Sequence, residues 1–137
     1  MAVLIDSSVF IGLERRGLPI QAIGAEIPSD ESVALSAITA SELLVGVHRA
    51  VTQAQRVTRE SLVEAILSAF PILPFDLQVA RIHARLLGEL LGSGQTVGAH
   101  DLLIAATALA FGYNVLTDNL RDFQKVPGLQ VRQPRWR

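Results

Sequence analysis

Residues 99–119, which read AHDLLIAATALAFGYNVLTDN, constrain the fold of this chain more than any other stretch. Behind Asp101 the sequence is apolar on nearly every side of a helix, and a helix that is apolar all round is a buried one. Gly112 and Asn114 stand where a helix C-cap belongs, and the short apolar run after them is typical of a buried strand. The stretch therefore predicts a buried helix–strand unit with a carboxylate at each end, Asp101 and Asp118.

Carboxylates beside a buried helix and strand need a compensating charge, because an unpaired charge in apolar surroundings costs roughly several kcal/mol. Lys125 is the single lysine of the chain, and Arg121 is the nearest arginine. A bound cation is therefore a candidate partner for these acids. Eleven of the 12 basic residues are arginines, which suit phosphate contacts, although genome composition alone also produces such a bias.

The rest of the chain alternates strand-like runs with helical patterns, which favours an α/β fold with a largely parallel sheet. Strands are expected at residues 2–5, 32–35, 71–75, 115–116 and 128–131, with the first central and 71–75 and 128–131 at the edges. Helices are expected at residues 7–16, 19–27, 39–51, 53–70, 77–92 and 101–111, with a turn or short helix at 121–125. The expected N-terminal caps are Ser7 or Ser8, a capping box of Thr39 with Glu42, and Asp76.

Four acids are predicted to meet at one edge of this sheet, because ligands of open α/β sheets bind beyond the carboxyl ends of the strands. Asp6 and Asp118 follow strands, whereas Asp101 and Glu42 lie near the starts of helices. Converging carboxylates suit Mg²⁺, a hard cation that takes oxygen ligands. Each acid also has a structural interpretation: Glu42 as a capping partner, Asp101 as a complement to a helix dipole, and Asp118 as a turn residue. Asp6 is the hardest to explain without a ligand, since it ends a buried strand.

The histidines are weaker candidates for the site. His48 and His83 fall on apolar helix stripes, so core or interface positions are expected for both. His100 adjoins Asp101 and could support it, but a position at a helix start is sufficient explanation. Neither a nucleotide-binding glycine loop nor a G-x-S-x-G nucleophile motif occurs.

The composition limits the remaining function classes. The chain has 137 residues, which fits one domain, and no cysteine, which excludes disulfides and cysteine-ligated zinc. No basic leader and no run of 18 apolar residues occurs, so we expect a cytoplasmic protein without a membrane span. The net charge of −1 gives no overall signal for nucleic acid. The mean hydropathy of +0.38 and two long aliphatic stripes, at residues 40–51 and 79–90, predict a homodimer.

Four segments together resemble the PIN-domain nucleases, most closely the VapC-type toxins of toxin–antitoxin pairs. They are VLIDSSVFI, TASELLVGVHRA, AHDLLIAATALAFGYNVLTDN and RDFQKVPGL, in the same order and at similar spacing over essentially the whole chain. The resemblance implies one PIN-like three-layer α/β/α sandwich over residues 1–137. It also implies a Mg²⁺- or Mn²⁺-dependent endoribonuclease that is cytoplasmic, usually dimeric and neutralised by a VapB-type antitoxin.

The family's site residues carry over position by position. The acidic positions are matched by Asp6, Glu42 and Asp101, and the small polar positions beside them by Ser8 and Thr117. The fourth acid departs from the family pattern, because many relatives have Asp or Asn two residues after the threonine, which is Asn119 here. We favour Asp118 as the fourth acid with Asp122 as the alternate, and the occupancy of a second metal site stays open.

Three other functions remain compatible with the sequence. A phosphoacceptor receiver domain also gathers acids at strand ends, but it needs a lysine at the site, and Lys125 follows no strand end. A catalytically silent PIN-like scaffold would bind a partner without metal. A nuclease that cleaves DNA would use the same acids on another substrate.

Overall fold

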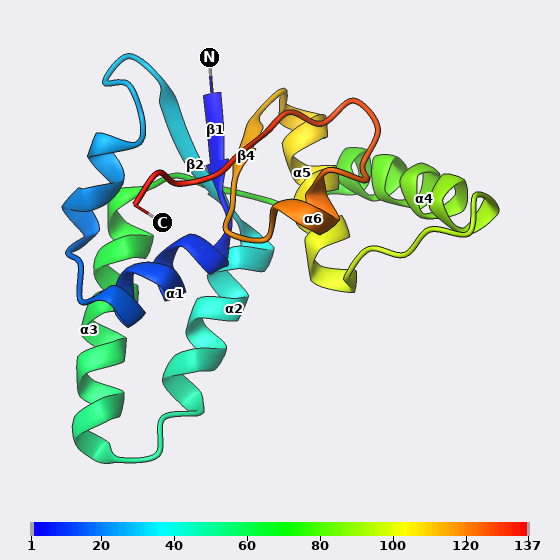
Figure 1. Cartoon of the computed structure of the whole chain (residues 1–137). Coiled ribbons are helices and arrows are strands. Elements are labelled where there is room, and N and C mark those ends of the chain that lie inside the picture. The colour runs from blue at the N-terminus through cyan, green and yellow to red at the C-terminus, as the bar shows by residue number, and fades with distance from the viewer. Residues whose placement is uncertain (1, 137) are drawn as a thin grey trace.

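A five-stranded parallel sheet forms the centre of the computed structural model, which describes residues 2–136 (Figure 1). The strands are β1 (Ala2–Ile5), β2 (Ser32–Ser36), β3 (Ile72–Leu73), β4 (Asn114–Leu116) and β5 (Val131–Arg132). Their order is β3-β2-β1-β4-β5, and every neighbouring pair is parallel. The first strand is therefore central and β3 and β5 are edges, as the sequence predicts.

The helices divide between the two faces of the sheet (Figure 1). The helices of one face are α1 (Ser7–Arg16), the 3₁₀ helix η1 (Ile20–Ala25), α2 (Ala37–His48) and α3 (Gln53–Ala69). The helices of the other face are α4 (Leu77–Gly92), α5 (Ala99–Phe111) and α6 (Leu120–Phe123). The predicted PIN-like α/β/α architecture is confirmed.

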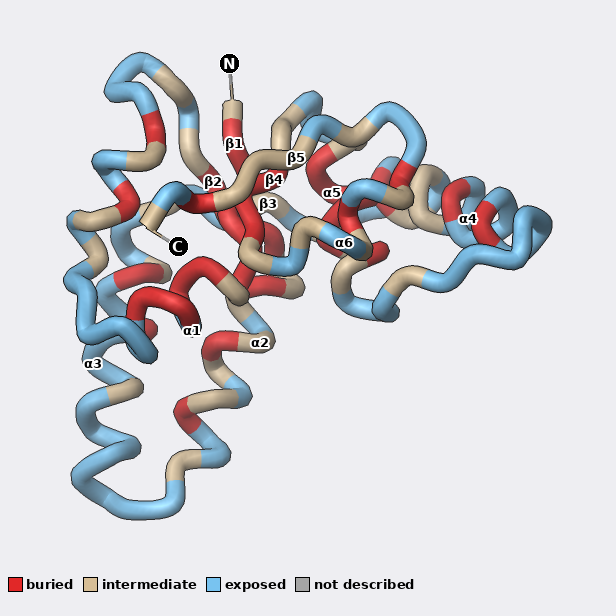
Figure 2. The backbone as a smooth tube through the Cα atoms, viewed as in Figure 1, coloured by how far each residue is buried: buried red, intermediate tan, exposed pale blue. Residues whose placement is uncertain are grey.

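The alternation of side chains along β1 creates two separate cores. Val3 and Ile5 pack with α1, α2 and α3, whereas Leu4, between them, packs with α4, α5 and α6. Figure 2 shows the resulting buried centre, with exposed residues confined to the outer helices and loops. Because both faces are covered, β1 is apolar throughout rather than alternating in polarity.

Helix α5 is buried as its sequence predicts. Leu102 and residues 104–108 are buried, and Thr107 satisfies its hydroxyl by donating to the Leu103 carbonyl oxygen at 2.8 Å. Gly112 ends the helix with a φ of +74°, a left-handed conformation that glycine adopts without strain. This helix leads into the parallel strand β4, so its first turn lies at the edge where the strands end.

Two of the predicted helix caps are wrong. Asp6, rather than Ser7 or Ser8, occupies the N-cap position of α1, and its side chain makes no capping hydrogen bond. Thr39 and Glu42 form no capping box, because α2 begins at Ala37 and the Ser36 hydroxyl accepts the Thr39 N–H at 3.0 Å. The serine that ends β2 thus takes the capping role and leaves the Glu42 carboxylate available to other partners. The predicted Asp76 cap of α4 is correct, with Oδ1 accepting the Val79 N–H at 3.0 Å.

The two aliphatic stripes turn inward only in part: on the first, Leu43 and Val47 are buried but Val51 is 90% exposed. Val79, Leu86 and Leu90 are buried in the core that α4 shares with α5. The large apolar residues left exposed on α4 include Leu77 and Leu91, at 66% and 67% exposure. The buried stripe therefore gives no support to the predicted homodimer, which rests on the outer face instead. None of the helices within residues 2–136 combines the length and apolar character needed to cross a membrane.

Candidate active site

The site lies where β1 and β4 end side by side. Ile5 pairs with Leu116 in the sheet, and the Asp6 N–H donates to the Leu116 carbonyl oxygen at 2.9 Å. Asp6 and Thr117 therefore leave neighbouring strands at the same level. The first turn of α5 brings Asp101 to this edge, and α2, which starts directly after β2, brings Glu42.

Two hydroxyl groups hold one carboxylate oxygen of Asp6, whereas the other oxygen has no hydrogen-bond partner among residues 2–136. Its side chain is buried, and its Oδ2 accepts hydrogen bonds from Ser8 Oγ at 2.7 Å and Thr117 Oγ1 at 2.8 Å. These hydroxyls in turn accept the backbone N–H groups of Asp118, at 2.9 Å, and Asn119, at 2.8 Å. Asp6 Oδ1 is buried without a hydrogen-bond partner in the described structure. Such an oxygen is costly to leave unsatisfied, so Oδ1 is a candidate ligand for a cation.

Burial raises the pKa of Asp6 above its ordinary value, against the opposing effect of the two hydroxyl hydrogen bonds. At Asp101, the effect of burial on the pKa is increased by repulsion from three neighbouring carboxylates. Burial, followed by repulsion from Asp6, Asp122 and Glu42, raises the pKa of Asp101 to about 6. The hydrogen bond from Asn119 Nδ2 to Asp101 Oδ2, at 2.6 Å, offsets only part of this. The acids therefore repel one another, and a divalent cation would relieve that repulsion.

Glu42 has two polar partners, Ser7 and His100, that its sequence pattern does not predict. Its Oε1 accepts from Ser7 Oγ at 3.1 Å, and its Oε2 lies 3.2 Å from His100 Nδ1. His100 could have been found from its place beside Asp101, but no local pattern links Ser7 to an acid 35 residues away. These contacts fix the Glu42 carboxylate from both sides.

Asp118 and Asp122 lie in different surroundings. The Asp118 carboxylate faces α1, where its Oδ2 is 4.0 Å from Arg16 Nη1 and a Cβ at Gly12 would lie 2.7 Å from it. Asp122 instead accepts the Gly98 N–H at 3.1 Å, beside the first turn of α5. The structure thus turns Asp118, the favoured fourth acid, toward α1 and brings the alternate, Asp122, close enough to act on the charge of Asp101.

The carboxylates at this edge are the type of ligand that magnesium prefers, but they do not all converge on one position. Within residues 2–136, no group of three acidic or histidine side chains has the arrangement that would by itself hold a metal ion. Mg²⁺ does not need one, since it usually keeps several waters and binds through one or two carboxylates and substrate phosphates. Asp6, with its unsatisfied buried oxygen, and Asp101, whose carboxylate is near enough to be repelled by that of Asp6, are two carboxylates that could serve in this way.

The PIN-domain family model matches residues 3–129, and the chain therefore belongs to the PIN-domain family, as its sequence motifs predict. Its relatives include several proteins named VapC. Ribonuclease VapC1 of Rickettsia felis is 36% identical over 131 residues, which cover 96% of this chain and 95% of that protein.

Solved structures of VapBC complexes have the same fold. VapBC-5 from Mycobacterium tuberculosis matches with a TM-score of 0.74 and 35% identity over 96% of both chains. VapBC2 from Rickettsia felis, solved bound to a promoter DNA fragment, matches with a TM-score of 0.87 over 98% of this chain and 99% of that one. Its 23% identity makes it evidence for the fold alone.

Proposed function

We propose that this chain is a metal-dependent endoribonuclease and the toxin of a type II toxin–antitoxin pair, acting in the cytoplasm. One observation carries the proposal: Asp6 Oδ1 is buried and unsatisfied at the sheet edge that also holds Asp101 and Glu42. The proposal is supported by the 36% identity to a VapC ribonuclease over nearly the whole of both chains.

The acids of the site have different proposed roles. Asp6 and Asp101 would hold Mg²⁺ or Mn²⁺, which when bound lowers the pKa of a water and offsets charge on the phosphate. Glu42, fixed by Ser7 and His100, would bind the same ion or orient the attacking water. For the fourth acid, the electrostatic effect on Asp101 favours Asp122 over Asp118.

The polar residues between the acids keep them in place before substrate arrives. Ser8 and Thr117 both donate to the same oxygen of Asp6, which leaves the other oxygen directed away from them. Asn119 holds Asp101 in the same way. Fixed carboxylates reduce the reorganisation needed during the reaction, which is the main contribution a protein makes to such chemistry.

The proposed partners are RNA, a VapB-type antitoxin and a second copy of the chain. Helices α1, α2 and α3 enclose a cavity of about 420 Å³ with mainly apolar walls that include Phe10, Val47 and Ile66. Glu42 also lines this cavity, so a segment that occupied it would end beside the acids. We assign the cavity to an apolar antitoxin segment, an assignment supported by the VapBC complexes among the structural matches.

RNA cleavage assays on variants in which the two principal acids are replaced test the proposal. Asp6→Asn and Asp101→Asn should each abolish Mg²⁺-dependent cleavage while circular dichroism shows the fold intact, because each change removes a charge and little volume. Arg85→Ala, on the remote helix α4, serves as the control and should cleave normally. Cleavage within a few-fold of wild type in both acid variants would contradict the metal site.

Two further outcomes of the same experiment separate the alternatives. Absence of cleavage together with negligible Mg²⁺ binding by calorimetry would indicate a silent scaffold. Cleavage of single-stranded DNA in preference to RNA of the same sequence would indicate a deoxyribonuclease.

A further inference from the structure

Most basic side chains that the structure describes already have a partner. Hydrogen bonds or ion pairs engage Arg16, Arg59, Arg85, Lys125, Arg132 and Arg135. Within residues 2–136, no such contact engages the other five, which are Arg15, Arg49, Arg56, Arg81 and Arg121. Unpaired arginines on a chain of net charge −1 are available for an external anion.

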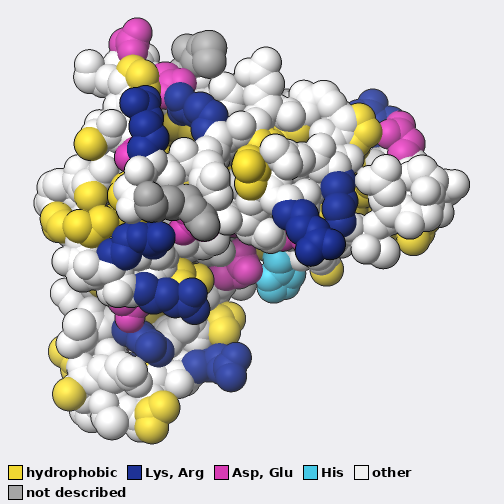
Figure 3. All heavy atoms as spheres, viewed as in Figure 1, with side chains coloured by type: hydrophobic (Ala, Val, Ile, Leu, Met, Phe, Trp, Pro, Cys, Tyr) yellow, Lys and Arg dark blue, Asp and Glu magenta, His cyan; other side chains and the backbone are white. Residues whose placement is uncertain are grey.

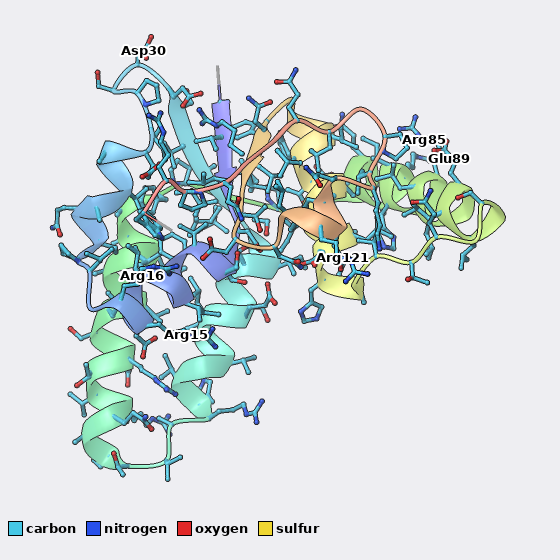
Figure 4. All side chains as sticks on the ribbon, in the orientation of Figure 1. Arg15, Arg16, Asp30, Arg85, Glu89 and Arg121 are labelled. Carbon is cyan, nitrogen blue, oxygen red and sulfur yellow. The ribbon has the colours of Figure 1, made fainter. Side chains whose placement is uncertain are left out.

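Two of these five arginines border the acids, one on each side. Arg15 lies in the last turn of α1 and lines the same cavity wall as Glu42. Arg121 lies on α6, between Asn119, which binds Asp101, and Asp122. Figure 4 shows Arg15 on the α1 side and Arg121 on the α6 side of the edge where the strands end. The other three are Arg49, which directly follows α2, Arg56 in the first turn of α3, and Arg81 on α4.

The surface therefore alternates in charge across the site. Figure 3 shows acidic and histidine side chains near the middle of this face, with dark blue Lys and Arg side chains on either side. Both Arg15 and Arg121 are exposed, so their guanidinium groups are open to a ligand from solvent.

A polyanion is the ligand that this alternation fits. The carboxylates at the centre of this face repel a phosphate chain, because both carry negative charge. A guanidinium group on each side offsets that repulsion, because its planar set of N–H donors can bond two oxygens of one phosphate at once. One phosphate would then lie over the acids while its neighbours along the strand meet the arginines.

We propose that Arg15 and Arg121 bind the backbone phosphates on either side of the cleaved bond, so that one RNA strand crosses the acids from α1 to α6. The inference rests on the proposed ribonuclease function and adds the path of the substrate. Because phosphates carry no base identity, the two arginines fix the register of the strand rather than its sequence.

Single substitutions of the two arginines test the path. Arg15→Ala and Arg121→Ala should each raise KM for a single-stranded oligoribonucleotide about ten-fold and leave kcat within two-fold. Affinity for the oligonucleotide, measured by fluorescence anisotropy in chelator, should depend less steeply on salt, with the log–log slope smaller by about 0.7 per arginine. Arg→Lys at either position should recover the slope but only part of the affinity, because lysine keeps the charge and loses the bidentate contact.

Arg85→Ala is the matched control, because it removes the same charge from an exposed site on α4 whose partner, Glu89, is 4.0 Å away. If both test variants matched this control in KM and salt slope, the proposed path of the RNA strand would be wrong. Cleavage of RNA by the wild-type protein would still support the proposed ribonuclease function. A fall in kcat with unchanged KM and slope would also overturn the inference, since it would place the arginines at the reaction rather than along the strand. If wild type cleaved no RNA, the proposed function would fail, yet equal slopes for all variants would still refute phosphate binding separately.

Discussion

Replacement of Asp101 by asparagine should stabilise the metal-free protein at neutral pH. Burial and three neighbouring carboxylates raise the pKa of Asp101 from 3.8 to about 6, so the ionised side chain is unfavourable in the folded state. Asparagine has nearly the same volume and no charge, and its carbonyl oxygen can still accept the hydrogen bond from Asn119. The substitution therefore removes the repulsion and keeps the local contact.

The magnitude follows from the pKa difference between the folded and unfolded states. A shift of this size corresponds to at most about 3 kcal/mol at pH above 6. Because Asp101 is only half-buried, solvent screening reduces the expected gain to about 1 kcal/mol. For a domain of this length, that gain corresponds to a rise in melting temperature of about 3–4 °C.

The sign of the effect depends on pH. A carboxyl group with a raised folded-state pKa contributes its full stability below the unfolded pKa of 3.8, and that contribution is lost as pH rises through about 6. In chelator at pH 7.5, Asp101→Asn should thus melt above wild type, and at pH 4 the difference should vanish. Mg²⁺ should then raise the melting temperature of wild type more than that of the variant.

Thermal melts of both proteins in chelator and in Mg²⁺, at the two pH values, provide the measurement. Glu89→Gln on α4 is the control, because it removes one exposed carboxylate far from the site and should change neither the pH dependence nor the response to Mg²⁺. A variant that melted below wild type at pH 7.5, or responded equally to Mg²⁺, would refute the clustering of the acids.

Three further predictions concern the surroundings of the site. Gly12→Ala should leave stability nearly unchanged in wild type, where the new Cβ would meet Asp118 Oδ2 at 2.7 Å and Arg16 Nη1 at 2.9 Å, but should stabilise the double variant Arg16→Ala/Asp118→Ala by about 1 kcal/mol through helix propensity. Urea unfolding of the four proteins checks this, and equal effects in both backgrounds would mean that these two side chains do not rest on Gly12. An antitoxin peptide carrying an arginine should bind Asp6→Asn more weakly than wild type and should compete with Mg²⁺. If the affinity for the peptide, measured by calorimetry, changed neither with Asp6→Asn nor with Mg²⁺, inhibition would work by covering the site. Light scattering should show a homodimer at micromolar concentration, and Leu77→Glu or Leu91→Glu on the exposed face of α4 should yield monomers. A monomeric wild type would exclude the homodimer.

The sequence by itself determined the framework of this protein. The all-round apolar pattern of α5 required burial, and a short apolar run ending at Asp6 required a central strand, because such segments are stable only when covered on both faces. Since the carboxyl ends of parallel strands share one edge, the meeting of Asp6 with Asp101 also followed from the pattern.

Only the tertiary structure decided how the polar groups at that edge are paired. The contacts of Glu42 with Ser7 and His100, and of Asp101 with Asn119, join residues far apart in the sequence. The turn of Asp118 toward α1 likewise depends on the space that Gly12 leaves, which no local pattern reveals. Hydrophobic periodicity specifies which face of an element is buried, whereas a hydrogen bond depends on the path of a loop to within an ångström or less. The sequence therefore predicts the fold, but it does not predict which residues complete the acidic site.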